Sequence, residues 1–115
     1  MTLQWGVFRA NLDPVQGSEQ AGLRPVVVVS RESIHERLPV VTILPLTSRK
    51  PGRRIFSTEV LIPGGIAGLS ADSLAMAHQI RTLSKGRLGA RLGEIPSGDL
   101  QRRLREAVRL YLDLD

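Results

Sequence analysis

The stretch Pro25-Val26-Val27-Val28-Val29 places four consecutive β-branched residues after a proline. Such side chains disfavour a helix and favour a strand, and the unbroken apolar run predicts a strand that is buried on both faces. A second apolar run, from Val40 to Leu46, has the same character and ends at Thr47-Ser48. These two runs predict a fold that is organised around a sheet.

The segments on either side of these runs predict further short strands. Leu3 to Leu12 is expected to be a strand that contributes Trp5, Val7 and Phe8 to the core and stops at Asp13-Pro14, because proline cannot continue the ladder. Ile55 to Ile62 partly alternates, with Phe56, Thr58, Val60 and Ile62 on one face and Ser57 and Glu59 on the other, which predicts a half-exposed strand. Three more segments complete the prediction: extended chain at 72–82, a short helical turn at 84–89 and a strand at 91–95.

The C-terminal segment is the only convincing helix in the sequence. Pro96-Ser97 is expected to start it, with Ser97 as the N-cap and Asp99 in the first turn. Apolar residues recur at spacings of three and four, which gives one apolar stripe. The stripe consists of Leu100, Leu104, Ala107, Val108 and Tyr111. The predicted fold class is therefore mainly β with a C-terminal helix, in the form of a small, curled antiparallel sheet or barrel.

Length and composition limit the function classes. The chain has 115 residues and 42% apolar residues, which predicts one compact domain over residues 1–115. Its net charge is +5, and all basic residues except Lys50 and Lys85 are arginines. This balance suggests a polyanionic partner such as nucleic acid, although a GC-rich genome also favours arginine. The absence of cysteine excludes disulfides and thiolate metal sites. No signal peptide or membrane span is evident, so we expect a soluble, cytoplasmic protein.

Familiar catalytic sets are missing, and the candidate residues lie on loops at strand ends. We expect His35 to be solvated and His78 to be structural, and no carboxylates or histidines have metal-ligand spacing. The loop candidates each have a plain alternative, namely a surface arginine, a strand terminus or a solvated turn. They are Ser18, Glu19, Gln20, Arg24, Thr47, Ser48 and the basic run Arg49-Lys50-Pro51-Gly52-Arg53-Arg54.

Three blocks resemble one family of proteins. The first is Asn11-Leu12-Asp13-Pro14 followed by Gly17-Ser18-Glu19-Gln20-Ala21-Gly22-Leu23-Arg24-Pro25-Val26. The second is Leu44-Pro45-Leu46-Thr47-Ser48, and the third combines Gly68-Leu69-Ser70-Ala71-Asp72-Ser73 with Gln79-Ile80-Arg81-Thr82. In this order they resemble the motifs of MazF/PemK/Kid toxins of type II toxin–antitoxin systems, and the similarity spans nearly the whole chain.

The resemblance implies an SH3-like barrel of the CcdB/MazF kind that works as a homodimer. It implies an endoribonuclease that cuts single-stranded RNA, typically mRNA, selectively and without a cofactor or metal. A cognate antitoxin is implied as partner, with its C-terminal segment in the RNA groove. By position, Arg24 and Thr47 match the catalytic pair. Substrate-binding roles are carried over or assigned to Ser18, Glu19, Gln20, Ser48, Arg49, Lys50, Arg53, Arg54, Gln79 and Arg81.

One departure and two rival functions remain open at the level of sequence. Gln4-Trp5-Gly6 stands where the family has an Arg-Gly-Asp-like step, and Arg9 stands where an aromatic or aliphatic residue is common. On the same fold, CcdB-like toxins poison DNA gyrase by protein contact, but that activity needs a C-terminal tryptophan, and this chain ends Tyr111-Leu112-Asp113-Leu114-Asp115. A non-catalytic nucleic-acid-binding regulator is the second rival.

Overall fold

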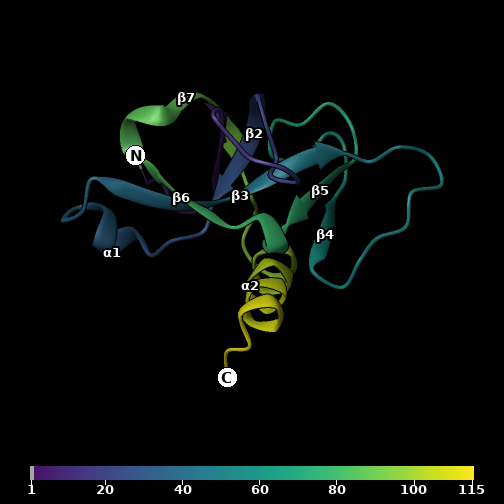
Figure 1. The fold of residues 1–115 in the computed structure, drawn as a ribbon. Helices are drawn as coiled ribbons and strands as arrows, with labels where there is room; N and C mark the ends of the chain where they lie inside the picture. Colours follow the sequence, from purple (N-terminus) through teal and green to yellow (C-terminus); the bar gives the residue numbers. More distant parts are fainter. Residues whose placement is uncertain (1) are drawn as a thin grey trace.

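The computed structural model describes residues 2–115 and shows a curved β-sheet with one long helix beneath it (Figure 1). Its strands and helices follow one another in this order: β1 (Gly6–Asn11), β2 (Leu23–Val28), α1 (Glu32–His35), β3 (Val40–Ser48), β4 (Glu59–Ile62), β5 (Ser73–Met76), the 3₁₀ helix η1 (Ala77–Gln79), β6 (Arg81–Ser84), the 3₁₀ helix η2 (Lys85–Arg87), β7 (Leu88–Glu94) and α2 (Asp99–Leu112).

The sheet is antiparallel, and its strand order is β4-β5-β3-β2-β1-β7, with β6 also paired to β3. The nine-residue β3 is the central strand. Along one edge, its residue Ile43 pairs with Val28 of β2, and along the other edge the same residue pairs with Arg81 of β6. Beyond Leu46, β3 continues only with β5. The end of β3 therefore leaves β2 and runs out beside the second half of the sheet.

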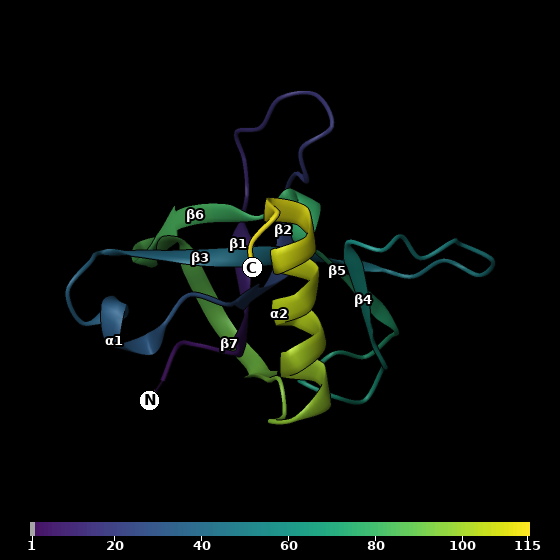
Figure 2. The same cartoon turned by 90° about the horizontal axis from the view of Figure 1, so that it is seen from below.

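The valine run is buried on both faces, as the sequence predicts. Val26, Val27 and Val28 have no exposed surface. Successive side chains of a strand point to opposite faces. Val27 therefore joins the core between the sheet and α2, while Val26 and Val28 join a second core on the other face of the sheet. Figure 2 shows α2 lying across the underside of the sheet, where Leu104 and Ala107 complete the first core. The apolar stripe of the helix is confirmed at its centre.

The sheet curls like a barrel, and a loop brings its two ends together. The loop that follows β4 packs on β7: a Cβ on Gly68 would lie 1.9 Å from the Leu92 carbonyl oxygen, and a Cβ on Gly93 would lie 2.5 Å from the carbonyl carbon of Ala67. Only glycine permits such a close approach of two backbones. The predicted fold class, mainly β with a C-terminal helix, is confirmed.

The structure corrects two predictions about secondary structure, namely the strand at 55–62 and the N-cap of α2. The segment 55–62 forms a strand only over Glu59–Ile62, and within it Glu59 is buried while Phe56 before it is about half exposed. The burial is reversed because the Glu59 carboxylate pairs with Arg53. At the start of α2, the N-cap is Gly98 rather than Ser97, because the backbone turns there through φ 98°, which glycine adopts without strain. No helix within residues 2–115 has the length and apolar character needed to cross a membrane.

Candidate functional site

The first part of the candidate site lies where β2 and β3 separate. Val26 pairs with Pro45, and continuing this register by two residues sets Arg24 against Thr47, beyond the end of the ladder. A pocket of about 310 Å³ opens between the two strand ends. It is lined by Ala21, Gly22, Leu23, Arg24, Pro25, Leu46, Thr47, Ser48 and Ser73. The pocket thus brings together the two residues that the sequence places in a catalytic pair.

Arg24 presents a charged, partly free donor group to this pocket. Its Nε donates a hydrogen bond to the Ala21 carbonyl at 2.8 Å, which fixes the plane of the guanidinium. Within residues 2–115, its terminal nitrogens have no hydrogen-bond partner and no carboxylate lies within 4.0 Å of them. Thr47 is half-buried beside Leu46, and Ser48 is exposed. A fixed guanidinium and a hydroxyl that line the same pocket are suited to holding a phosphate group.

A second pocket has a volume of about 180 Å³ and also involves the loop before β2 and the strand β3. Glu19, Gln20, Gln79 and Arg81 line it, together with Leu12, Pro45, His78 and Ile80. The two pockets are lined by consecutive residues of the same two segments, because Gln20 borders one and Ala21 the other, and Pro45 borders one and Leu46 the other. The candidate site therefore consists of two pockets, each lined in part by the loop of residues 12–22.

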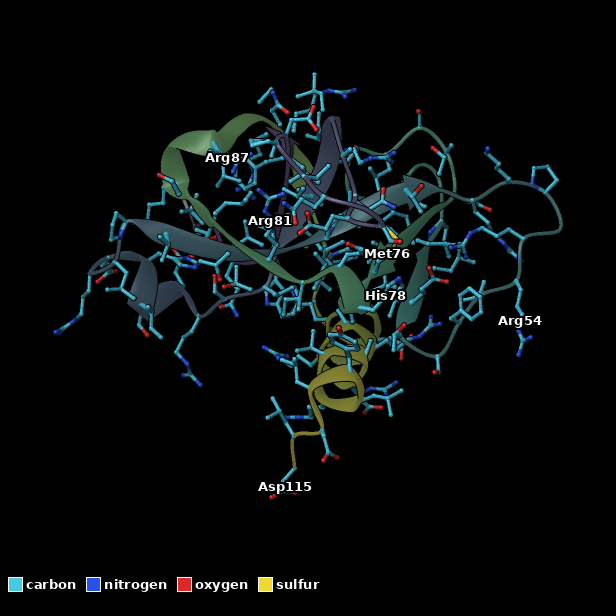
Figure 3. The ribbon with its side chains drawn as sticks, in the orientation of Figure 1. Arg54, Met76, His78, Arg81, Arg87 and Asp115 are labelled. Carbon is cyan, nitrogen blue, oxygen red and sulfur yellow. The ribbon has the colours of Figure 1, made fainter. Side chains whose placement is uncertain are left out.

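Side chains from distant elements hold this loop on the sheet. Gln79 donates to the Ser18 carbonyl at 3.0 Å and accepts a hydrogen bond from the Gln20 amide at 3.3 Å. Arg81 donates to the Leu12 carbonyl at 2.7 Å, and Arg87 donates to the carbonyls of Asn11 and Asp13 at 2.6 and 2.7 Å. Figure 3 shows Arg81 and Arg87 on this side of the sheet. Ser18 thus contributes its backbone carbonyl to the anchoring of this loop.

The basic loop between β3 and β4 follows directly from Ser48. Arg53 donates to both oxygens of Glu59 at 2.9 Å, and the Phe56 amide also donates to Glu59 at 3.0 Å. Burial opposes ionisation of Glu59, but these hydrogen bonds outweigh it and hold the pKa of Glu59 below its ordinary value. Glu59 in turn raises the pKa of Arg53. Arg49, Lys50 and Arg54 are exposed, and Figure 3 shows Arg54 at the outer side of the loop.

The structure therefore sorts the predicted site residues into three places. Arg24, Thr47 and Ser48 share the first pocket, Glu19, Gln20, Gln79 and Arg81 share the second, and the run 49–54 forms the loop that leaves the first. Sequence reasoning did not find the loop anchor Arg87 or the lining residues Pro45, His78 and Ser73. An arginine far along the chain that binds backbone carbonyls leaves no spacing signal.

The two histidines differ in their environments. His78 forms a 2.8 Å hydrogen bond with the Thr58 hydroxyl and meets the edge of the Tyr111 ring, in accord with the expected structural role. His35, expected to be solvated, is instead buried, with 3% of its surface exposed. Its Nε2 lies 2.6 Å from the Ser30 hydroxyl, and its Nδ1 lies 3.2 Å from Glu32. These local partners satisfy the ring nitrogens, which is why the ring can leave water.

Glu32 belongs to the same cluster and fixes the start of the chain. Its Oε1 accepts hydrogen bonds from the backbone amides of Leu3 and Gln4 at 2.9 and 2.8 Å. Partial burial disfavours its charge, but these amides and His35 outweigh that effect and lower the pKa of Glu32. The cluster is part of the scaffold. In the described part of the chain, no group of three or more histidine or carboxylate side chains could hold a metal ion.

The chain is similar to known proteins over most of its length. The sequence profile of the PemK-like, MazF-like toxins of type II toxin–antitoxin systems matches residues 3–112. Endoribonuclease MazF9 of Mycobacterium tuberculosis is 34% identical over 113 residues, covering 94% of this chain and 93% of the relative. Endoribonuclease MazF of Staphylococcus saprophyticus is 41% identical over 86 residues, covering 75% of this chain and 71% of the relative.

A solved structure shares the whole fold. It is an endoribonuclease from a mycobacterial species in complex with its cognate antitoxin, and it matches with a TM-score of 0.79 at 26% identity, covering 100% of this chain and 98% of that chain. A small curled sheet, a C-terminal helix and a basic pocket at parting strand ends define the class. The chain belongs to the PemK-like, MazF-like family of type II toxins.

Proposed function

We propose that this chain is the toxin of a type II toxin–antitoxin system and an endoribonuclease that cuts single-stranded RNA, mRNA above all, at selected sequences. The observation that carries the proposal is the single pocket that Arg24 and Thr47 share. The endoribonuclease names of the M. tuberculosis and S. saprophyticus relatives support the reaction class. The whole of residues 1–115 serves as one toxin domain, which acts in the cytoplasm.

The proposed chemistry uses the hydroxyl of the substrate itself. The 2′-oxygen attacks the phosphorus and the bond from phosphorus to the 5′-oxygen breaks, which leaves a 2′,3′-cyclic phosphate and a 5′-hydroxyl. The proton lost by the 2′-hydroxyl is balanced by one gained at the 5′-oxygen. Arg24 stabilises the extra negative charge on the phosphate, because a guanidinium can grip two of its oxygens. A guanidinium keeps its proton in proteins, so an arginine is a poor base.

The remaining residues hold the RNA. Thr47 donates a hydrogen bond to the scissile phosphate, and Ser48 assists it at the mouth of the pocket. Glu19, Gln20, Gln79 and Arg81 contact the neighbouring nucleotides in the second pocket, and the loop residue Ser18 positions the chain. Their hydrogen bonds to base edges choose the sequence. Because Arg53 is already paired with Glu59, Arg49, Lys50 and Arg54 are the cations that guide the RNA backbone.

Two partners complete the proposal. A cognate antitoxin, like the one bound to the mycobacterial structure, inhibits by laying its C-terminal segment in the RNA groove. A second copy of this chain forms a homodimer. Support for the dimer comes from the end of α2, where large apolar side chains stay exposed. They are Leu110, Tyr111, Leu112 and Leu114.

The test is end-mapping of a mixed RNA incubated with the purified protein, with and without EDTA. We expect cuts with cyclic phosphate and 5′-hydroxyl ends in both buffers. Arg24→Ala should lower the cleavage rate about 10²- to 10³-fold, the loss seen when one charge-stabilising donor is removed. Its circular dichroism spectrum and sedimentation should stay unchanged. Full cleavage by Arg24→Ala, or loss of all cleavage in EDTA, would contradict the proposed mechanism.

A further inference from the structure

A separate groove lies on the flank of α2. It encloses about 200 Å³ between the start of β1, the end of β2 and the helix. Its lining residues are Trp5, Val29, Leu104, Arg105, Val108 and Arg109, none of which lines either pocket of the candidate site. Four of the six are apolar, so the floor of the groove differs from the polar lining of the second pocket. The groove therefore favours a ligand with an apolar part.

The cations of this groove are uncompensated. Along α2, the carboxylates of Asp99 and Glu106 form ion pairs with Arg102 and Arg103. In the part of the chain that the structure describes, no carboxylate comes within 4.0 Å of Arg105 or Arg109. These two arginines are four residues apart, so they lie one above the other on the same side of the helix. They flank the apolar floor with two positive charges.

Trp5 occupies the groove in a strained backbone conformation. Its φ is 68°, a left-handed value that a bulky residue rarely adopts. Two hydrogen bonds hold it there: its amide donates to the Val28 carbonyl at 2.7 Å, and its carbonyl accepts from the Ile95 amide at 2.8 Å. Strain of this kind clusters at ligand clamps. The sequence showed this tryptophan as a departure from the family, and the structure shows where its indole points.

The indole has no free face for a nucleobase. Only 9% of Trp5 is exposed, and the Arg105 guanidinium lies over its ring, 5.0 Å from the ring centre. A guanidinium stacked in this way keeps N–H donors at its edge. Arg105 can thus offer donors to a carboxylate while the indole edge, Val29 and Val108 receive an apolar side chain. These features argue against single-stranded RNA, which needs an open ring to stack on.

We infer that this groove, defined by Trp5, Arg105 and Arg109, is a docking site for an acidic peptide segment of a partner protein. One large aliphatic side chain of the segment enters the hollow, and carboxylates on either side of it bind Arg105 and Arg109. Complementary charge selects the peptide, and the apolar floor anchors it. The site lies apart from the proposed RNA pockets, so a partner can hold the toxin here without touching Arg24 or Thr47.

Trp5 is the only tryptophan in the chain, so its fluorescence reports on the groove directly. The probes are capped heptapeptides of glutamates around a central leucine, isoleucine or methionine, titrated into the full chain. We expect at least one probe to shift the Trp5 emission in a saturable way. The version with glutamine in place of glutamate should bind at least tenfold more weakly. Arg105→Gln/Arg109→Gln should also weaken binding at least tenfold.

Two controls separate docking from general charge or misfolding. Arg49→Gln/Lys50→Gln removes the same charge from the exposed loop between β3 and β4, which does not line the groove, and should leave the affinity unchanged. Arg109→Gln alone keeps the stacked Arg105–Trp5 pair and should still weaken binding. The absence of saturable binding by all three probes, or an equal loss in the Arg49/Lys50 control, would overturn the inference.

Two further measurements distinguish peptide binding in the groove from binding of a second copy of the chain, and the groove from the proposed nuclease site. An emission shift that grows with protein concentration, without peptide, and disappears in Arg105→Gln/Arg109→Gln would show a second copy in the groove and overturn the inference. RNA cleavage by that variant should match wild type, and a clear loss would contradict the separation of the two sites. If wild type cuts no RNA but binds the probe, the proposed nuclease fails and the groove stands.

Discussion

The two loops that border the candidate site differ in how many side chains of later elements anchor them. The loop of residues 12–22 is fastened to the sheet by Gln79, Arg81 and Arg87, three side chains from later elements that bind its backbone. The loop of residues 49–58 contains one ion pair of its own, between Arg53 and Glu59, and within residues 2–115 only Thr58 at its end binds a side chain of a later element, His78. Its other cations stay in solvent. The comparison teaches that the first loop shapes the pockets and the second supplies charge around them.

Removing the charge of the second loop should give the largest effect. Arg49→Gln/Lys50→Gln/Arg54→Gln leaves the Arg53–Glu59 pair intact, so the fold should hold. Each phosphate contact on single-stranded RNA contributes about 0.7 to the log–log salt slope, so the slope should fall by about 2. If the plots of log affinity against log salt concentration for wild type and variant meet at about 1 M, the affinity at about 0.1 M salt should drop roughly 100-fold. Filter binding across a salt series measures both quantities.

The matched control for that variant is Arg31→Gln/Arg37→Gln/Arg109→Gln, which removes equal charge from three exposed positions beside α1 and on α2. It should alter the slope far less. A changed cleavage sequence with an unchanged salt slope in Arg49→Gln/Lys50→Gln/Arg54→Gln would mean that this loop contacts bases. The roles assigned to the two loops would then be wrong.

Releasing the first loop should give an intermediate effect. Gln79→Ala removes two hydrogen bonds to the loop backbone, each worth about 0.5–1.5 kcal/mol. Hydrogen exchange at the amides of residues 18–22 should speed up, and KM for RNA should rise, while the sheet amides stay protected. Gln101→Ala is the matched control, since Gln101 also donates to a backbone carbonyl, that of Ile95, but far along the chain from the loop. Equal exchange in both variants would refute the anchoring role.

Acid should loosen the second loop, with the smallest effect. The pKa of Glu59 is lower in the folded chain than its ordinary value of 4.5, so the unfolded chain binds more protons and stability rises with pH through this range. The contribution is complete above pH 4.5 and is lost as the pH falls through the lower, folded value. Urea unfolding of wild type between pH 6 and 3 should therefore show a steeper loss than Glu59→Gln. Parallel curves would show that the pair adds no pH-dependent stability.

The parts of the fold that sequence reasoning predicted are those decided by neighbouring residues. Val26 to Val28 are buried on both faces because a β-branched run can satisfy two cores. The predictions failed where distant or unusual partners decide. Glu59 is buried because Arg53 meets it across a turn, and His35 is buried because Ser30 and Glu32 take its nitrogens. The cap of α2 falls on Gly98 because of a positive φ that no spacing reveals.

The candidate site likewise has features that the sequence predicted and features that depend on contacts between distant residues. Resemblance to the family pointed to Arg24 and Thr47, but only the register of β2 and β3, and the departure of β3 toward β5, places them around one pocket. Nothing in the spacing of Arg81 and Arg87 indicated that both would bind the backbone of residues 11–13. Contacts between residues about 70 positions apart depend on the completed sheet.

The most direct test of the central claim is a double-mutant cycle on the cleavage rate of one short RNA. Arg24→Ala and Thr47→Val each remove one side of the proposed pair, and Thr47→Val keeps the shape of the side chain. If both groups act on the same phosphate, the double variant should lose much less than the product of the two single losses. Losses that multiply fully, with each variant folded, would mean that Arg24 and Thr47 act independently and would contradict the account.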